Sequence, residues 1–337
     1  MPAMIPAMLA DSVEDLLATV ERRESFHSAD FRSGSAFERV WIDGEPHVVK
    51  FLHLDDDFTM RVSGDVGCRP IRAYAAGLLD LAPDLIDHAV VGAATGHGRN
   101  GWGGALLMRD VSAELVPPGD DPLPADQHLR FLDHLAGLCA RTWGWQDDVG
   151  MLPYAARWAW FSDASIESER ALGWRERVPA IAAEGWDAFG RRAPADVARV
   201  VNELRQDCSP LAAALADTPS CLLHGDWKIS NVGTAADGRT VLIDWAYVGE
   251  GPACHELTWY LALNRQKLPE GHSKEQVTDD FRVALERHGV DTERWWLPQL
   301  ELCLLGALVQ FGWEKALGDD AEFGWWCDAA RPGMARL

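Results

Sequence analysis

The sequence predicts an α+β fold of two lobes, in which a small antiparallel sheet with one main helix precedes a larger, mostly helical lobe. Three observations support this prediction. Strand-like segments dominate residues 1–110, a breaker-rich connection follows them, and residues 111–337 carry long helical patterns interrupted by one strand–hairpin unit. A chain of 337 residues is long enough to bury a core in each of two such lobes.

In the first lobe, alternating apolar residues and turn signals indicate the elements. Asp43-Gly44 is a dipeptide typical of two-residue hairpin turns, and it joins the first two expected strands. The expected elements are a helix over 11–24, strands near 37–42, 47–52, 85–93 and 104–111, and a helix ending over 71–81.

In the second lobe, helical spacing begins after the connection PPGDDPLPAD at 117–126. Leucines near helical spacing predict a helix over 127–143, and a second pattern predicts one over 195–207. A strand, a loop and a hairpin interrupt the helices at about 220–246, and 275–330 is again helical.

The composition is that of a globular protein with an acidic surface. The formal net charge of −21 repels phosphate backbones, so we expect no binding to nucleic acid. Two interpretations of this charge stay open: an acidic cleft that attracts a cationic substrate, or a generally solubilising surface.

Cysteine usage and hydropathy indicate a cytoplasmic location. The seven cysteines are scattered, without a CxxC pair or zinc-ligand spacing, which favours reduced thiols. No apolar run is long enough to span a bilayer, and the first residues lack the basic region of a signal peptide. We therefore expect a cytoplasmic protein that does not bind membranes.

The candidate catalytic residues lie close together in one segment, SCLLHGDWKISNVGTAADGRTVLIDWAYVGEGP (220–252). An apolar strand delivers Asp226 into a loop, Asn231 follows five residues later, and a hairpin returns the chain to Asp244. This path brings the three side chains to one end of the hairpin. A carboxylate can accept the proton of a hydroxyl, while carboxylate and amide oxygens are ligands that Mg²⁺ prefers.

These residue types fit phosphoryl transfer, which depends on positioning and charge neutralisation more than on covalent catalysis. In this interpretation Asp226 is the base, and Asn231 and Asp244 bind the metal. Lys228 lies between them and is a candidate for contact with the γ-phosphate, with a solvated or substrate-facing role as the alternative. We expect His224 to be structural, through hydrogen bonds to the loop backbone.

The motif HGDWKISN resembles the H-G-D-x-x-x-x-N catalytic loop of aminoglycoside phosphotransferase-like and choline kinase-like small-molecule kinases, and IDW resembles their metal-binding segment. The resemblance covers roughly residues 25–265. It implies a bilobal protein-kinase-like fold, ATP or GTP as the phosphoryl donor, and Mg²⁺. It also implies a nucleotide-binding lobe over 1–110 and a helical lobe over 111–337 that holds the catalytic loop.

The resemblance further implies where the nucleotide binds. VVKFL offers Lys50 as the strand lysine for the α- and β-phosphates, and LLMRDVS (106–112) looks like the hinge between the lobes. The expected nucleotide contacts are Lys50, the hinge backbone of Met108, Arg109 and Asp110, and the short phosphate loop Ser33, Gly34 and Ser35.

Two acidic positions near these contacts are the partner of Lys50 and Glu256. Related kinases usually pair the strand lysine with a helix glutamate, yet 51–80 contains no glutamate. Either Asp65 substitutes for it or the pair is absent. Downstream, the resemblance suggests an acidic residue that ties a helix to the catalytic loop, and Glu256 fits this structural role. A favourable negative charge at the start of the helix explains the same residue equally well, and a contact with substrate is the lesser alternative.

The sequence thus predicts a phosphotransferase that moves the γ-phosphoryl of ATP or GTP to a hydroxyl of a small molecule. The acidic charge favours an amine-bearing acceptor, such as an amino sugar, aminoglycoside or amino alcohol, over a neutral sugar. Candidate acceptor contacts, with a solvated or core role as the default, are Glu301, Asp319, Asp320, Glu322, Trp295, Trp296, Trp313, Trp325 and Trp326.

Two other functions stay open. The missing helix glutamate favours a catalytically silent pseudokinase or regulatory module that binds nucleotide, whereas intact Asp226, Asn231 and Asp244 argue against it. A protein substrate has less support, because Asp244 is followed directly by WAYVGEGP and a helix, without a segment like an activation loop.

Overall fold

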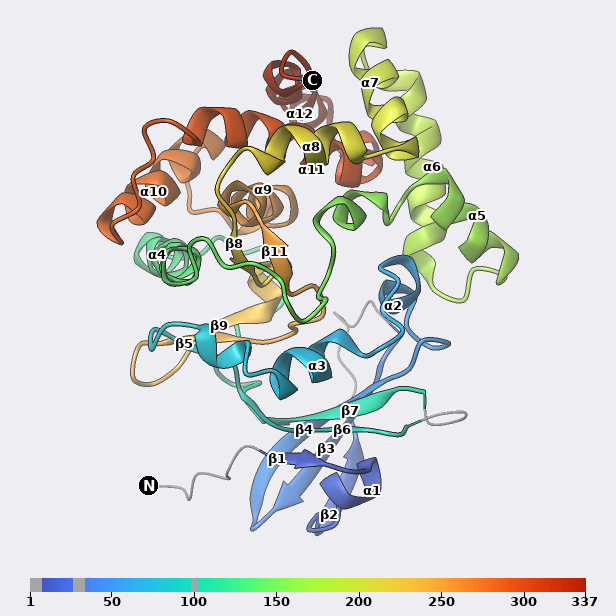
Figure 1. Cartoon of the computed structure of the whole chain (residues 1–337), viewed down its shortest axis with the longest axis vertical. Helices are drawn as coiled ribbons and strands as arrows, with labels where there is room; N and C mark the ends of the chain where they lie inside the picture. Colours follow the sequence, from blue (N-terminus) through green and yellow to red (C-terminus); the bar gives the residue numbers. More distant parts are fainter. Residues whose placement is uncertain (1–7, 27–33, 98–101) are drawn as a thin grey trace.

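The computed structural model describes residues 8–26, 34–97 and 102–337. A six-stranded sheet lies at one end of the molecule, in the strand order β1-β6-β7-β4-β3-β2 (Figure 1). Neighbouring strands are antiparallel, except that β1 runs parallel to β6. The strands are β1 (Met8–Ala10), β2 (Arg22–Ser25), β3 (Ala36–Ile42), β4 (Glu45–Leu52), β6 (Val90–Thr95) and β7 (Gly104–Arg109).

The hairpin predicted at Asp43-Gly44 is confirmed. Both residues have positive φ, 52° and 78°, which is the backbone of a type I′ turn, and they join β3 to β4.

Alternation along β4 decides which way its lysine points. Val49 and Phe51 pack in an apolar cluster with the short helix α1 (Val13–Leu16), on one face of the sheet. Val48 and Leu52 belong to the large core on the other face. Because side chains alternate along a strand, Lys50 shares the face of Val48 and Leu52 and is directed toward the second lobe.

Two predicted helices are shorter than the sequence pattern suggested. The helix expected over 11–24 is wrong beyond α1, since Arg22–Ser25 forms edge strand β2, which Arg23 ties to Glu38 of β3. The helix expected to end over 71–81 is α3 (Arg69–Ala75). It stops before Gly77, whose φ of 71° leaves the helical region, and a 3-10 turn follows.

The strand predicted over 85–93 is divided between two sheets. Its first part, β5 (Ile86–Asp87), pairs in parallel with β10 (Thr240–Leu242) of the second lobe, and its second part is β6 of the first lobe. Ala89, with φ 57°, lies between them and breaks the strand. The predicted single strand is therefore a link between the lobes.

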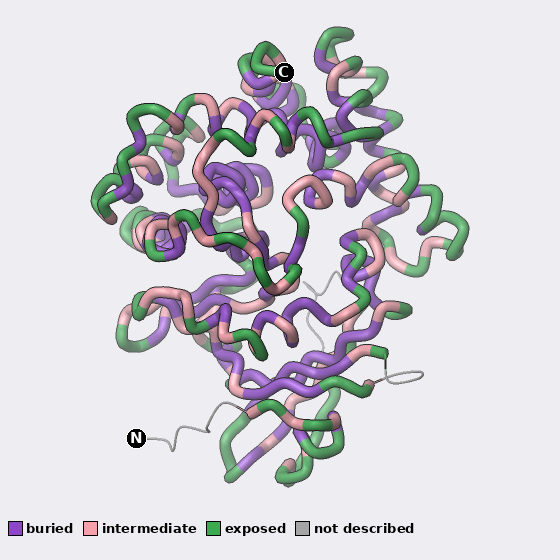
Figure 2. The backbone as a smooth tube through the Cα atoms, in the orientation of Figure 1, coloured by how far each residue is buried: buried purple, intermediate pink, exposed green. Residues whose placement is uncertain are grey.

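The second lobe is mostly helical, as predicted for 127–143, 195–207 and 275–330. Buried helices α9 and α11 lie inside it, and Figure 2 shows α9 as buried along its length. The helices are α4 (Ala125–Arg141), α5 (Asp163–Ala171), α6 (Arg177–Arg192), α7 (Ala195–Gln206), α8 (Ser209–Ala216), α9 (Ala253–Leu263), α10 (Lys274–Arg287), α11 (Trp296–Leu317) and α12 (Asp320–Met334).

An ion-pair cluster joins the lobes at α2 (Phe58–Val62). Arg61 of α2 donates to both carboxylate oxygens of Glu169 in α5, at 2.8 and 2.9 Å, and to Glu176 at 2.6 Å. Glu169 is 2% exposed, so this two-pronged contact is shielded from water.

We expect Arg61→Ala to lower the free energy of unfolding by about 3 kcal/mol, because it leaves Glu169 buried without its cation. Urea unfolding followed by circular dichroism measures the change. The control is Arg170→Ala, which removes an exposed pair with Glu167 and should cost no more than about 0.5 kcal/mol. Equal losses of unfolding free energy in the two variants would contradict a stabilising role for the buried Arg61–Glu169 ion pair.

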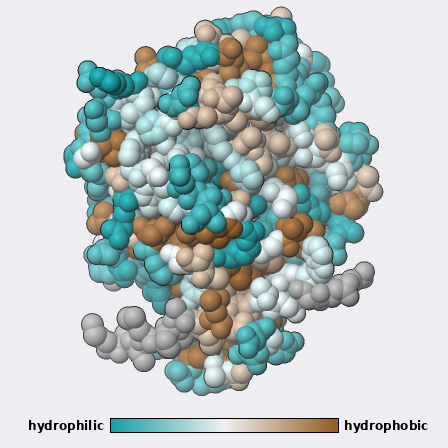
Figure 3. Space-filling model, in the orientation of Figure 1, coloured by the Kyte–Doolittle hydropathy of each residue, from teal (hydrophilic) through white to brown (hydrophobic). Residues whose placement is uncertain are grey.

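In the ranges that the structure describes, no helix is both long and apolar enough to cross a membrane. The face in Figure 3 is largely hydrophilic, with apolar residues distributed among polar ones.

Candidate active site

The predicted catalytic loop leaves a buried strand through a glycine turn. β8 (Cys221–Leu223) is fully buried and is followed directly by His224. Gly225 has φ 81°, and a Cβ there would lie 2.4 Å from the Tyr247 carbonyl oxygen, so only glycine fits. This close approach holds the loop against the segment that follows Asp244.

His224 supports the loop as a neutral imidazole. Its Nδ1 accepts the Asp226 N–H at 3.2 Å, so its Nε2 carries the proton that is donated to the Ile243 carbonyl at 3.0 Å. Burial lowers the pKa of His224 to about 4. These bonds join the loop to the hairpin, as expected for a structural histidine.

Asp226 is held by three side-chain donors. Its Oδ2 accepts from Asn231 Nδ2 at 2.8 Å and lies 3.1 Å from Lys228 Nζ, while its Oδ1 accepts from Trp259 Nε1 at 3.0 Å. The residue is 2% exposed, and burial raises the pKa of its carboxyl, which Lys228 partly offsets. The structure thus brings Asp226, Asn231 and Lys228 together.

Asp244 meets Lys50 across the lobes. Lys50 Nζ donates to Asp244 Oδ1 at 2.8 Å, and Asp244 adopts the left-handed region with φ 65°. Burial alone would raise the pKa of Asp244, but the cations Lys50 and Lys228 outweigh burial and lower it. Asp244 is therefore an anion at neutral pH.

The carboxylate that supports Lys50 from its own lobe is Asp57, not Asp65. Asp65 accepts the N–H of Arg69, the first residue of α3, with both oxygens. Asp57 is 1% exposed and caps α2 through Thr59 N–H at 2.8 Å. Burial would lower the pKa of Lys50, but Asp244 and Asp57 together raise it.

The described part of the predicted phosphate loop lies against the same aspartate. The Ser35 hydroxyl donates to Asp57 Oδ2 at 2.6 Å. Gly34 has φ 84°, and a Cβ there would collide with the Asp56 carbonyl oxygen at 2.1 Å. Ser33, the third residue of the predicted phosphate loop, lies outside the described residues.

The predicted hinge, Met108 to Asp110, begins within the last residues of β7. Met108 pairs with Val48 and Val90, whereas the Arg109 N–H donates to the Ala89 carbonyl at 2.9 Å and the Asp110 N–H to Pro46 at 3.2 Å. The backbone N–H groups of Arg109 and Asp110 are thus already used inside the lobe. The predicted contact with a purine then falls to carbonyl groups of this segment.

The side-chain oxygens near Asp226 are of the kind that binds Mg²⁺. Asn231 donates its Nδ2 hydrogens to Asp226, which leaves Asn231 Oδ1 without a described partner. Asp244 bonds Lys50 through Oδ1, which leaves its Oδ2 free of Lys50. Among the described residues, no group of three or more His, Cys, Asp or Glu could hold a metal ion. Asn231 and Asp244 are thus the residues that would hold a magnesium ion here, with phosphate oxygens and water completing its shell.

Glu256 ties α9 to the catalytic loop. Its Oε1 accepts the Gly225 N–H at 2.8 Å, and its side chain is fully buried. Burial raises the pKa of Glu256 to about 7, although the Gly225 N–H and Arg157 oppose the shift. This matches the structural role expected for this residue.

The raised pKa predicts a pH-dependent stability. The folded chain keeps a proton on Glu256 that the unfolded chain releases, so this stabilisation is complete below pH 4.5 and lost as pH rises through about 7. Relative to Glu256→Gln, the wild-type free energy of unfolding should fall by about 3 kcal/mol over that range. Urea unfolding of both proteins from pH 5 to 8 measures it, and a constant difference would refute the assignment.

The C-terminal candidates for acceptor contact are engaged elsewhere. Their carboxylates form ion pairs: Glu301 with Arg336, Asp319 with Arg265, Asp320 with Arg192 and Glu322 with Lys274. The tryptophans Trp296, Trp313 and Trp326 are buried, while Trp295 and Trp325 pack against Trp143 and Lys274. The default structural roles fit these contacts better than acceptor binding.

Sequence reasoning missed Trp259 and Asn264, which hold the loop from α9. Asn264 Oδ1 accepts the Ile229 N–H at 2.7 Å, and its Nδ2 donates to the Tyr260 carbonyl at 2.9 Å. Trp259 lies three residues after Glu256, one helical turn along the same face. That spacing is the signal that could have found it.

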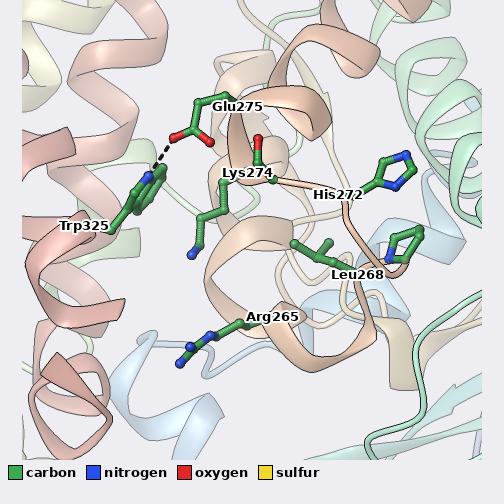
Figure 4. Close-up of a pocket in the computed structure, with 8 residues that line it drawn as sticks. Arg265, Leu268, His272, Lys274, Glu275 and Trp325 are labelled. Carbon is green, nitrogen blue, oxygen red and sulfur yellow. Dashed lines mark hydrogen bonds between the residues drawn. The ribbon is translucent and has the colours of Figure 1, made fainter. Parts of the chain in front are cut away.

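A surface pocket of about 360 Å³ lies between the start of α10 and α12 (Figure 4). Trp325 borders it on one side and His272 on the other. Lys274 lies 4.6 Å from the centre of the Trp325 ring and donates to Glu322, and Arg265 also faces Glu322. None of the residues predicted for catalysis lines this pocket, and its cations are already paired.

Comparisons with known proteins bear on the family and the fold of the chain. A model of the phosphotransferase enzyme family matches residues 68–292, which is more than half of the chain, while no curated protein matches it. The structure of choline kinase LicA from Streptococcus pneumoniae has a TM-score of 0.50 at 13% identity, over 96% of both chains. A microcompartment-associated aminopropanol kinase has a TM-score of 0.50 at 11% identity, over 96% of this chain and 94% of that chain.

These two structures show that the fold is protein-kinase-like, as the sequence predicted, and the family match covers β8 and the hairpin with Asp226, Asn231 and Asp244. The chain therefore belongs to the phosphotransferase enzyme family and is a kinase that acts on hydroxyl groups.

Proposed function

We propose that this kinase transfers the γ-phosphoryl of ATP or GTP to a hydroxyl of a small, amine-bearing molecule, with Asp226 as the base. The observation that carries the proposal is the position of Asp226. Its carboxylate is buried between Lys228 and Asn231, close enough to Asp244 for the two negative charges to interact.

In the proposed step, Asp226 orients the acceptor hydroxyl and accepts its proton. The hydroxyl oxygen forms a bond to the γ-phosphorus while the bond to the β–γ bridging oxygen breaks, and the nucleoside diphosphate leaves with that electron pair. Lys50 and Lys228 are placed to balance phosphate charge. Mg²⁺ at Asn231 and Asp244 would neutralise further charge on the triphosphate.

Two observations support an amine-bearing acceptor. The net charge of −21 attracts cations to the molecule as a whole. The two kinases of like fold are named for choline and aminopropanol, which are both amino alcohols. A small amino alcohol or amino sugar would present a hydroxyl for transfer and an ammonium group for electrostatic attraction.

The test is an ADP- or GDP-release assay with Mg²⁺ over choline, aminopropanol, homoserine, amino sugars, aminoglycosides and neutral sugars. We expect turnover that depends on an amine-bearing acceptor. Turnover with neutral sugars alone would contradict the acceptor class. Tight nucleotide binding with no acceptor-dependent turnover would instead favour the pseudokinase.

A further inference from the structure

The carboxylate of Asp226 is held differently on its two oxygens. Oδ2 faces Asn231 and Lys228, which the proposed function assigns to metal and phosphate. Within the described residues, the hydrogen-bond donor to Oδ1 is Trp259, through its indole Nε1 at 3.0 Å. An ionised aspartate only accepts hydrogen bonds, so its orientation follows from the donors around it.

Trp259 is a fixed donor. Its side chain is 3% exposed, and its ring contacts Phe311 at 5.0 Å, Trp160 at 5.7 Å and Tyr247 at 5.9 Å between ring centroids. All three pairs have the edge-to-face geometry that aromatic rings favour. The indole is also neutral, so the charge of a nucleotide does not draw it away.

The helix that carries Trp259 is anchored to the same loop. Glu256, one turn earlier on α9, accepts the Gly225 N–H, so α9 contacts the loop backbone with one residue and the Asp226 side chain with another. Lys228, in contrast, is 29% exposed on a long flexible side chain and is free to move to a phosphate.

We propose that Trp259 is a positioning residue for phosphoryl transfer: its indole N–H holds Asp226 Oδ1 and so fixes the rotation of the carboxylate that accepts the proton of the hydroxyl. This proposal rests on the proposed function of Asp226. A base that rotates away from the hydroxyl loses the alignment on which transfer depends, and small misplacements of catalytic groups cost up to about 100-fold in rate.

The test compares two Trp→Phe substitutions at buried positions. Trp259→Phe keeps a packed ring but removes the N–H. Trp186→Phe is the matched control, because Trp186 is buried against Phe189 and its indole N–H has no hydrogen-bond partner in the described structure. We expect Trp259→Phe to lower kcat about 10- to 100-fold with unchanged nucleotide affinity, and Trp186→Phe to stay within about twofold. Equal kcat values for the two variants would overturn the proposal.

A second measurement is independent of turnover. In a ¹⁵N-labelled protein, Trp259→Phe identifies the Trp259 indole resonance among those of the 16 tryptophans. We expect Asp226→Ala to shift that N–H resonance upfield, since it removes the acceptor, and to leave the Trp186 resonance in place. An unmoved Trp259 resonance would refute the contact. If Asp226→Ala shifts the Trp259 resonance but the wild-type protein shows no acceptor-dependent turnover, the contact stands and the proposed function of Asp226 is contradicted.

Discussion

Asp226→Asn should lower kcat by about 10² to 10⁴-fold, the range that a general base contributes. The amide cannot take the proton of the acceptor hydroxyl, and it presents an N–H₂ group where Asn231 and Lys228 already donate. Nucleotide affinity should stay close to that of the wild type, because the predicted metal and phosphate contacts remain. Steady-state kinetics and calorimetric titration with nucleotide separate the two quantities.

The matched control for this substitution is Asp237→Asn in the same hairpin. Asp237 is exposed in an Asp-Gly turn, and Asn-Gly is an equally good turn sequence, so kcat should be unchanged. If Asp226→Asn retained kcat within about threefold, Asp226 would not be the base. Thermal unfolding of each variant verifies that both are folded.

Asp244→Asn should weaken binding of the Mg²⁺–nucleotide complex by about 100-fold, a loss of about 3 kcal/mol. The substitution removes the charge of a predicted metal ligand while Lys50 remains. Asparagine is the correct replacement because Asp244 has φ 65°, a region that asparagine tolerates and alanine does not. Calorimetric titrations with Mg²⁺ and with EDTA measure the change, and the variant should show little difference between the two.

Asp43→Asn controls for the backbone effect, since Asp43 also has positive φ (52°) and lies in the β3–β4 turn. Its nucleotide affinity should match that of the wild type in both buffers. A full Mg²⁺ dependence in Asp244→Asn would show that the metal takes its ligands elsewhere.

The pairing of Lys50 with Asp244 has a consequence for binding. Lys50 is predicted to contact the α- and β-phosphates, and Asp244 to bind the metal, yet the two residues bind each other in the structure. On this prediction Lys50 would exchange its bond to Asp244 Oδ1 for phosphate oxygens, whereas Asp244 could offer its Oδ2 to the metal without leaving Lys50. Asp57, which is buried and linked to Ser35, keeps negative charge near Lys50 during the exchange.

The features that the sequence predicted correctly are those formed by residues close to one another along the chain. The catalytic loop, the hairpin and the Asp43-Gly44 turn are local, since a strand, a glycine and a fixed spacing specify their geometry within about 20 residues. The helix over 11–24 and the single strand over 85–93 were wrong because propensity alone does not include pairing. Arg22–Ser25 pairs with β3, and Ile86–Asp87 pairs with a hairpin from the other lobe.

The sequence by itself therefore determined the protein-kinase-like fold and placed Asp226, Asn231 and Asp244 on one loop and hairpin. Only the tertiary structure decided what surrounds them. Asp244 pairs with Lys50, 194 residues away, and the charge of Asp57 also acts on Lys50. Trp259 donates to Asp226, and the ion pair of Arg61 with Glu169 joins the lobes. The physical reason is that spacing fixes neighbours along a loop, whereas contacts between distant segments follow from how sheet and helices pack.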